Sequence, residues 1–396
     1  MTHYYQPEVG APQKRWNYLV EFLIKRGHEV AVCAPVPHYP LGRRFTQDKV
    51  WVWEPGAHGE QILRVPYVPY SGSMAVQMLD QAISSLAEVF ATTYMRTHKP
   101  DVVISTTPGL PMLFAGVVAS RTLRVPHIAE VRDAWPDLIW QTKLVDSATK
   151  SLLPKRVSSV LERKIIPQLL IRAKKEADAV IVTTKAFKRV SEGRGLNNVH
   201  LIRNVAEPHP SHPRAKQKGT LHLLYVGTVG RSQGLEHVVD AVRYIPQVTL
   251  RVVGDGAAKE QLKQQATGID NVHFYPQTVG GELEEHWKWA DSGLVTLAPL
   301  QAFEMTVPSK LYGVMARGKH VTGVLGGEAA SIVANSQAGD ISTPGNSQVL
   351  KALLNALAEK QELGNKIGHT QKWVSENASP ESAGKRLERV LFKVTQ

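Results

Sequence analysis

Two segments in the second half of the chain pair a basic side chain with glycines or with a small hydroxyl residue. The first contains Gly227, Gly230 and Arg231 after an apolar run. Glycines let the backbone approach a diphosphate, and the start of a following helix offers free N–H groups and the positive end of its dipole. The second places Ser309 and Lys310 at an expected helix start, although a simple N-cap role explains Ser309 equally well. We expect a diphosphate here, with ordinary turn chemistry as the alternative because the glycine spacing is not a dinucleotide fingerprint.

Charged residues of the first half also follow a predicted strand. Arg132 and Asp133 come after the run 127–130 and before a Trp-Pro pair. Ligands of parallel α/β sheets bind at the carboxyl ends of the strands, so both side chains are candidates for the reacting site. A structural salt bridge with neighbouring charges is the alternative. Gly10 lies in an opening loop that we place at the same edge, where a glycine suits a close ligand approach.

Strand-like apolar runs alternate with helical patterns in both halves, which predicts an α/β fold with doubly wound parallel sheets. A chain of 396 residues also exceeds the roughly 250–300 residues of a single core, so we expect two domains. Strands are expected at residues 29–32, 63–65, 102–105, 127–130 and 179–182 of the first half, and at 221–226, 249–253, 272–274 and 293–297 of the second.

A proline-rich segment separates the two halves. Prolines at 208, 210 and 213 can neither continue a helix nor donate to a sheet. We therefore assign residues 1–205 to an N-terminal domain, 206–219 to a linker, and 220–375 to a C-terminal domain. Residues 376–396 are expected to form a helix that packs back towards the first domain.

The opening residues resemble the end of a strand whose apolar body is missing. A strand at the centre of a parallel sheet is buried on both faces and normally carries a continuous apolar run. We therefore expect a truncated first strand, with a short strand over His3 to Tyr5 as the alternative.

The composition narrows the class of partner. A net charge of +12 favours anionic partners, but no helix-turn-helix, zinc-finger or RNA-binding signature accompanies it, so nucleic acid is not expected. The histidines lack the sequence spacing of a metal site, and the single cysteine, Cys33, excludes an internal disulfide. No apolar run is long enough to span a membrane and no signal segment opens the chain, which predicts a cytoplasmic protein.

The stretch 143–175 mixes basic residues with apolar ones at helical spacing. Such a helix can rest on an anionic membrane surface. An ordinary solvated outer helix has the same pattern, and the sequence leaves both interpretations open.

Taken in order, several of these segments resemble glycosyltransferase family four, whose members are retaining enzymes of the GT-B fold. The resemblance is strongest to the branch similar to bacterial fucosamine transferases of surface-polysaccharide synthesis. The segments that carry it lie at residues 3–12, 26–30, 132–136, 230–235, 254–256 and 307–312.

The resemblance implies two Rossmann-like domains facing each other across a cleft. It implies retaining transfer of a hexosyl or amino sugar from a nucleotide diphosphate donor, with UDP as the expected nucleotide, to a glycan or lipid-linked acceptor. No metal and no cofactor are expected, and the protein would work in the cytoplasm at the inner face of the membrane. Arg231 and Lys310 would bind the diphosphate and Glu328 the donor sugar, while Arg132 and Asp133 would position the reacting groups.

The chain departs from the family at one position of the donor site. Family members usually carry two glutamates eight positions apart, where this chain has Met305 and Gly313. The second glutamate typically accepts hydrogen bonds from the donor ribose, and such a charged bond contributes about 1.5–3 kcal/mol. Neighbouring Glu304 could compensate. The alternatives are a catalytically inactive GT-B protein that binds a nucleotide sugar or a partner, and a sugar-nucleotide epimerase.

Overall fold

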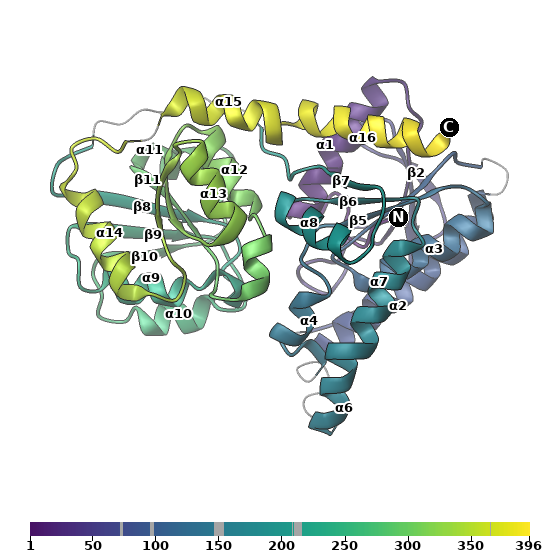
Figure 1. Cartoon of the computed structure of the whole chain (residues 1–396), viewed down its shortest axis with the longest axis horizontal. Helices are drawn as coiled ribbons and strands as arrows, with labels where there is room; N and C mark the ends of the chain where they lie inside the picture. The colour runs from purple at the N-terminus through teal and green to yellow at the C-terminus, as the bar shows by residue number, and fades with distance from the viewer. Residues whose placement is uncertain (72–73, 96–98, 146–153, 208, 210–215, 365) are drawn as a thin grey trace. The chain divides into compact units, whose positions relative to one another are not determined.

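The computed structural model of the chain describes residues 1–71, 74–95, 99–145, 154–207, 209, 216–364 and 366–396. They form two compact units (Figure 1), one made of Met1–Asn204 with Pro380–Gln396 and the other of Val205–Ser379. Residues 208 and 210–215 of the predicted linker lie outside the described residues. No helix among the described residues is long and apolar enough to cross a membrane.

The second unit is built around a parallel sheet with the strand order β10-β9-β8-β11-β12-β13. Successive side chains of a strand point to opposite faces, so Leu223 and Leu224 enter two separate buried clusters. The sheet is therefore covered on both faces, as parallel sheets generally are. Its strands are β8 (Leu221–Val226), β9 (Val248–Val253), β10 (Val272–Tyr275), β11 (Ser292–Thr296), β12 (His320–Val324) and β13 (Gly339–Ser342).

Helices complete both clusters of the second unit. One cluster contains residues of α9 (Leu235–Val242), α10 (Lys259–Gln265) and α14 (Ser347–Glu359). The other contains residues of α11 (Gly280–Trp289), α12 (Ser309–Ala316), α13 (Gly327–Asn335) and α15 (Ile367–Ala378). The four strands predicted in this half are confirmed. The strands β12 and β13 escape prediction because polar or small residues interrupt both.

The first unit contains two sheets, ordered β1-β3-β2 and β4-β5-β6-β7, in which only the β2–β3 pairing is antiparallel among the strands described. The strands are β1 (Ala31–Pro35), β2 (Trp53–Pro55), β3 (Gln61–Val65), β4 (Val103–Thr106), β5 (His127–Val131), β6 (Ala179–Val182) and β7 (Val199–Leu201). The five strands predicted in this half are confirmed, although β1 begins at Ala31 rather than at residue 29.

The helices of the first unit include two that carry residues of the site, α1 (Ala11–Lys25) and α2 (Met74–Ala91). The others are α3 (Leu110–Leu123), α4 (Asp137–Gln141), α6 (Lys155–Val160), α7 (Ile166–Lys175), α8 (Lys185–Gly193) and α16 (Pro380–Thr395), with a π-helical turn, η2 (Leu161–Ile165), between α6 and α7.

The backbone of Met1 and Thr2 joins the two sheets of the first unit. The Thr2 amide donates to the Cys33 carbonyl of β1 over 3.1 Å, and the Thr106 amide of β4 donates to the Met1 carbonyl over 3.2 Å. Thr2 therefore forms a parallel bridge to Thr106, and the short strand considered for His3 to Tyr5 is not formed. Through these hydrogen bonds residue 2 lies between β1 and β4, and so connects the edge strands of the two sheets.

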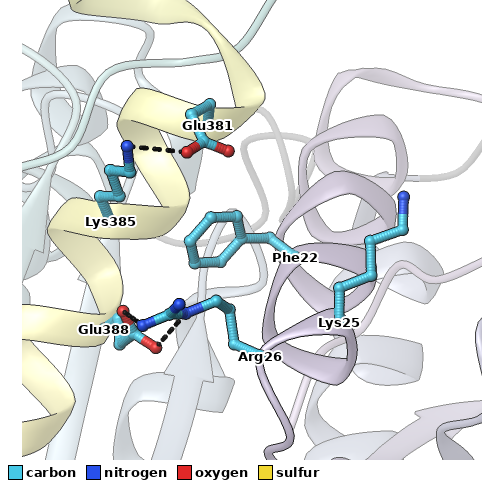
Figure 2. A pocket seen from close by; sticks show the side chains of 6 residues that line it. All are labelled: Phe22, Lys25, Arg26, Glu381, Lys385 and Glu388. Carbon is cyan, nitrogen blue, oxygen red and sulfur yellow. Dashed lines mark hydrogen bonds and ion pairs between the residues drawn. The ribbon is translucent and has the colours of Figure 1, made fainter.

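The C-terminal helix α16 packs against α1 within the first unit (Figure 2). The Arg26 Nε lies 3.0 Å from a Glu388 carboxylate oxygen. The Phe22 ring lies against Gly384, where a Cβ atom would overlap the ring. A cavity between the two helices contains none of the predicted site residues, and it is lined by Phe22, Lys25, Arg26, Glu381, Lys385 and Glu388.

The contact at Gly384 predicts an unusual response to alanine. A glycine in a helix interior costs about 1 kcal/mol relative to alanine, so alanine normally stabilises a helix. At Gly384 we expect the Gly384→Ala variant to be destabilised by about 1–3 kcal/mol, because the new methyl group must displace Phe22. Urea unfolding and amide exchange in α1 would measure this. The matched control is Gly368→Ala in α15, where nothing lies within 4 Å of the added Cβ; equal stability of the two variants would contradict the prediction.

Candidate functional site

The strand order of the second sheet creates a switch point between β8 and β11. From β8 the chain proceeds outward through β9 and β10, whereas β11 leads to β12 and β13 on the other side. Loops at such a point diverge and leave a crevice at the carboxyl ends of the strands. Here the Ala298 amide donates to the Ser232 carbonyl over 3.0 Å and the Thr296 hydroxyl to the Gln233 carbonyl over 2.8 Å. These bonds hold the loop after β8 at the end of β11.

Glycines allow two turns to stack at this edge of the sheet. Gly227, directly after β8, has φ of 130°, and Gly254, directly after β9, has φ of 144°. A Cβ atom at Gly254 would overlap the Gly227 carbonyl, so the second turn supports the first by backbone contact alone. A Cβ atom at Gly227 would lie only 3.4 Å from the Lys310 Nζ. The structure therefore brings the predicted Gly227 and Lys310 together.

Lys310 is a cation in a poorly solvated position. Its Nζ donates a short hydrogen bond to the Tyr225 hydroxyl of β8 and lies 4.0 Å from the centroid of that ring. Burial lowers the pKa of Lys310 to about 7. Lys310 forms no ion pair with any residue that the structure describes. A bound anion would supply the missing counter-charge.

Ser309 does not have the simple capping role that the sequence left open. The N-cap of α12 is Pro308 in an extended conformation, and no side chain caps this helix. Ser309 is the first residue of α12, so its amide and that of Lys310 belong to the first turn, whose N–H groups have no partner within the helix. The capping interpretation of Ser309 is therefore wrong.

The other predicted donor residues flank this centre. Gly230 precedes a short 3-10 helix, η3 (Arg231–Gln233), in which Arg231 is exposed. Glu328 lies in the first turn of α13, beside Gly327, whose φ of 55° places its backbone directly against the Glu304 carbonyl. The donor residues thus follow β8, β11 and β12, all at the carboxyl edge of one sheet.

In the first unit, a buried ion pair links α1 to the end of β5. The Arg15 Nη2 lies 2.8 Å from the Glu130 carboxylate, which also accepts hydrogen bonds from the Trp16 indole over 2.9 Å and the Thr106 hydroxyl over 2.6 Å. Burial opposes the charged form, but Arg15, Arg132 and these hydrogen bonds outweigh it and hold the pKa of Glu130 below its usual value. Neither Arg15 nor Glu130 is among the site residues predicted from the sequence. A carboxylate in a buried strand needs a positively charged or hydrogen-bonding partner. A glutamate at the end of an apolar strand could therefore have indicated such a pair.

This pair positions Arg132, which follows β5. The Arg132 Nη2 donates to the Asn204 side chain over 3.2 Å, while its Nε and Nη1 have no hydrogen-bond partner among the described residues. Burial lowers the pKa of Arg132 to about 10 and raises the pKa of Asp133. Neither residue forms an ion pair with a described residue, so the salt-bridge alternative is not supported.

Gly10 is the N-cap of α1, the helix that carries Arg15. Its φ of −177° is ordinary extended backbone, and an added Cβ would meet only the flexible end of Gln13. The local geometry does not require a glycine at position 10, so its role beside a ligand stays a prediction.

Comparison with known sequences and structures identifies the family. Residues 10–204 match the family described as Glycosyl transferase 4-like domain, and residues 211–373 match Glycosyl transferases group 1. The chain belongs to glycosyltransferase family four. This family-four glycosyltransferase is 25% identical over 336 residues to WcaI of Escherichia coli K12, which carries a provisional assignment as a colanic acid biosynthesis glycosyl transferase, and the match covers 79% of each chain. It is 23% identical over 380 residues to the sulfoquinovosyl transferase SQD2 of Arabidopsis thaliana, covering 91% of this chain and 66% of the relative.

Solved structures show the same fold as this family-four glycosyltransferase. Sucrose-phosphate synthase from Thermosynechococcus elongatus superposes with a TM-score of 0.73 at 15% identity, over 98% of this chain and 94% of that one. HepE of Anabaena, solved in complex with UDP and glucose, superposes with a TM-score of 0.66 at 18% identity over 98% of both chains. The fold is GT-B, with two parallel-sheet α/β domains, and the enzyme uses a nucleotide-sugar donor.

If Lys310 binds the donor as predicted, its lowered pKa should make donor binding sensitive to pH. Only the protonated amine attracts a diphosphate, so a bound diphosphate raises the pKa of Lys310. Above pH 7 the amine of the free enzyme is mostly neutral, and binding therefore takes up a proton. We expect the affinity for a UDP-sugar, whose diphosphate diester does not titrate in this range, to fall about tenfold per pH unit above pH 7. Calorimetry in buffers of different ionisation enthalpy would measure the proton uptake. In Lys310→Met the slope should vanish, and an unchanged slope would contradict the role of Lys310.

Proposed function

We propose that the enzyme transfers a hexosyl or amino sugar from a UDP-linked donor, with retention of anomeric configuration and without a metal ion at the diphosphate. One observation carries this proposal: a half-buried lysine with no described counter-ion lies beside a glycine turn at the switch point of the second sheet. As the sugar leaves, negative charge develops on the diphosphate, and fixed positive groups stabilise that charge without solvent reorganisation. The choice of UDP is supported by the complex of HepE with UDP and glucose.

The remaining donor residues have complementary roles in this proposal. The backbone at Gly227 and Gly230 approaches the diphosphate, Arg231 supplies a second positive charge, and the first turn of α12 at Ser309 supplies N–H donors. Glu328 accepts hydrogen bonds from the hydroxyls of the donor sugar.

On the first unit, Arg132 and Asp133 position the reacting groups. The buried pair of Arg15 with Glu130 fixes the end of β5, from which both side chains project. The free Nε and Nη1 of Arg132 are then available for a ligand.

The proposed acceptor is a glycan or a lipid-linked sugar of cell-envelope polysaccharide synthesis, as in the branch similar to fucosamine transferases. The relation to WcaI supports this class. An anionic membrane surface on the cytoplasmic side is part of the proposal, because α6, η2 and α7 expose both basic and apolar side chains. The exposed apolar residues are Val157, Val160, Ile165 and Leu169, and the exposed basic residues include Lys155, Arg156 and Lys164.

A donor panel with a lysine variant tests the proposal. We expect saturable binding of UDP-sugars in preference to GDP- and ADP-sugars, and a chelator should not change this binding. The enzyme should transfer the sugar to acceptors in anionic vesicles. NMR of the product should show the same anomeric configuration as in the donor. Lys310→Ala should lower kcat by about 10²–10³-fold, because it removes charge stabilisation at the leaving group. The matched control is Lys351→Ala, which removes a lysine that lies 3.9 Å from the Tyr244 ring in the same unit.

Two outcomes would overturn this function. Donor binding without transfer or hydrolysis would favour an inactive binding protein, and conversion of the donor to its epimer would favour an epimerase. A requirement for added Mg²⁺ or Mn²⁺ in donor binding would contradict the metal-free diphosphate site.

The glycine at position 313 predicts a gain of function. Nothing lies within 4 Å of an added Cβ at Gly313, so a side chain can start there without a clash at its first atom. We expect Gly313→Glu to bind the donor about 10–100-fold more tightly, because a carboxylate can accept hydrogen bonds from the ribose. Gly313→Ala is the control: like Gly313→Glu it should stabilise the helix by up to about 1 kcal/mol, but it should not bind the donor more tightly. Equal donor affinities of the two variants, measured by calorimetry, would show that no ribose lies beside this position.

A further inference from the structure

Three side chains from distant parts of the first unit converge in its interior. His3 follows the bridging residue Thr2, His38 follows β1, and Asp80 lies in α2. All three are buried, with at most 2% of each residue exposed. The Asp80 Oδ2 lies 3.2 Å from the His3 Nε2 and 3.0 Å from the His38 Nε2. Among the described residues, this is the one group of three histidine, cysteine or acidic side chains whose ligand atoms lie within 4.8 Å of one another.

A hydrogen bond of His38 determines which of its ring nitrogens carries the proton. The His38 Nδ1 lies 2.7 Å from the Val36 carbonyl, which can only accept, so Nδ1 carries the proton. In the neutral ring the Nε2 lone pair then points at a carboxylate oxygen, so either a proton or a metal ion must lie between them. Orientation of a histidine by a backbone carbonyl is the usual second-sphere support of a metal ligand.

The other carboxylate oxygen of Asp80 is also held by neighbouring groups. Its Oδ1 accepts the Val68 amide over 2.8 Å and faces the Ser84 hydroxyl at 3.4 Å, which leaves Oδ2 for the two imidazoles. Nearby, Glu8 accepts the His38 amide over 2.9 Å. These contacts hold His38 and Asp80 in place and leave one Asp80 oxygen facing both imidazoles.

We propose that His3, His38 and Asp80 bind a divalent transition-metal ion of the Zn²⁺ class. Two imidazole nitrogens and one carboxylate oxygen form a ligand set that such ions prefer over Mg²⁺ and Ca²⁺. Ligands at about 2.0–2.1 Å in a tetrahedral site lie roughly 3.3 Å apart, close to the observed spacing. Without a metal ion, one proton between His38 and Asp80 would serve, because a neutral His3 can donate its own Nε2–H to the same carboxylate oxygen. The ion would tie the opening loop, the loop after β1 and α2 together at the carboxyl edge of the first sheet.

The three ligands of this site belong to the first unit, whereas Lys310 and the Gly227 turn belong to the second. The proposal revises the expectation of no metal drawn from histidine spacing. Motifs such as His-x3-His report ligands on one helix, whereas these three ligands meet only through the tertiary fold.

Metal analysis of the full chain tests the proposal. The protein is stripped with a chelator and titrated with Zn²⁺ against a chromophoric competitor, and with Co²⁺ for its visible spectrum. We expect one Zn²⁺ per chain, a tetrahedral or five-coordinate Co²⁺ spectrum, and a higher Tm with Zn²⁺. His3→Gln and His38→Asn, which retain polar side chains of similar size, should each weaken Zn²⁺ binding at least about 10–100-fold.

The matched control is His222→Asn in the second unit. His222 also lies 3.0 Å from a carboxylate, that of Asp291, but no third ligand joins this pair in the described structure. This variant should bind Zn²⁺ like the parent. UDP-sugar binding reports folding of the second unit, and circular dichroism reports folding of the variants. No stoichiometric binding by the parent, or equal binding by His3→Gln, His38→Asn and His222→Asn, would overturn the proposal in favour of a protonated ion pair.

Discussion

Parallel pairing of the strands is the constraint on which the rest of this structure depends. Strands that run in the same direction deliver all their following loops to one edge of the sheet, so residues far apart in sequence must meet there. In the second unit this edge collects the turns after β8 and β9 and the first residues of α12 and α13. In the first unit it collects the residues after β1 and β5 and the N-terminus of α1. The proposed site residues lie at these edges, whereas the faces of the second sheet are covered by helices.

The environment of Lys310 explains why we propose this side chain for the binding of a diphosphate. Desolvation makes the charged amine unfavourable in the free enzyme, while the electron-rich face of Tyr225 partly offsets that cost. A side chain held in this state gains more from a diphosphate than an exposed lysine would, since part of its desolvation has already taken place before the ligand arrives. In this proposal, poor solvation of the amine lowers the stability of the free protein, and the bound diphosphate recovers that free energy as binding affinity.

Much of this arrangement could be predicted from the sequence. Alternating strand and helix patterns predict the parallel sheets, and the glycines after β8 together with Lys310 predict a cluster at one sheet edge, where Gly227 and Lys310 do lie together. Tyr225 could not be selected, because a tyrosine inside an apolar strand looks like any core residue until its hydroxyl partner is known. Glu130 and Arg15 are separated by most of a domain in sequence, and only the tertiary fold makes them a pair. The same holds for His3, His38 and Asp80, whose convergence depends on a bridge formed by a single residue, Thr2. Polar strands such as β13 carry no periodic signal, since an edge strand needs less apolar surface.

The docking of α16 on α1 has a consequence for the order in which the protein is made. The first unit is discontinuous, because its C-terminal helix is translated only after the whole of Val205–Ser379. During synthesis the second unit can therefore complete its core first, although it comes later in the chain. Until Pro380–Gln396 emerges from the ribosome, the surface of α1 around Phe22 stays uncovered and is available to a chaperone.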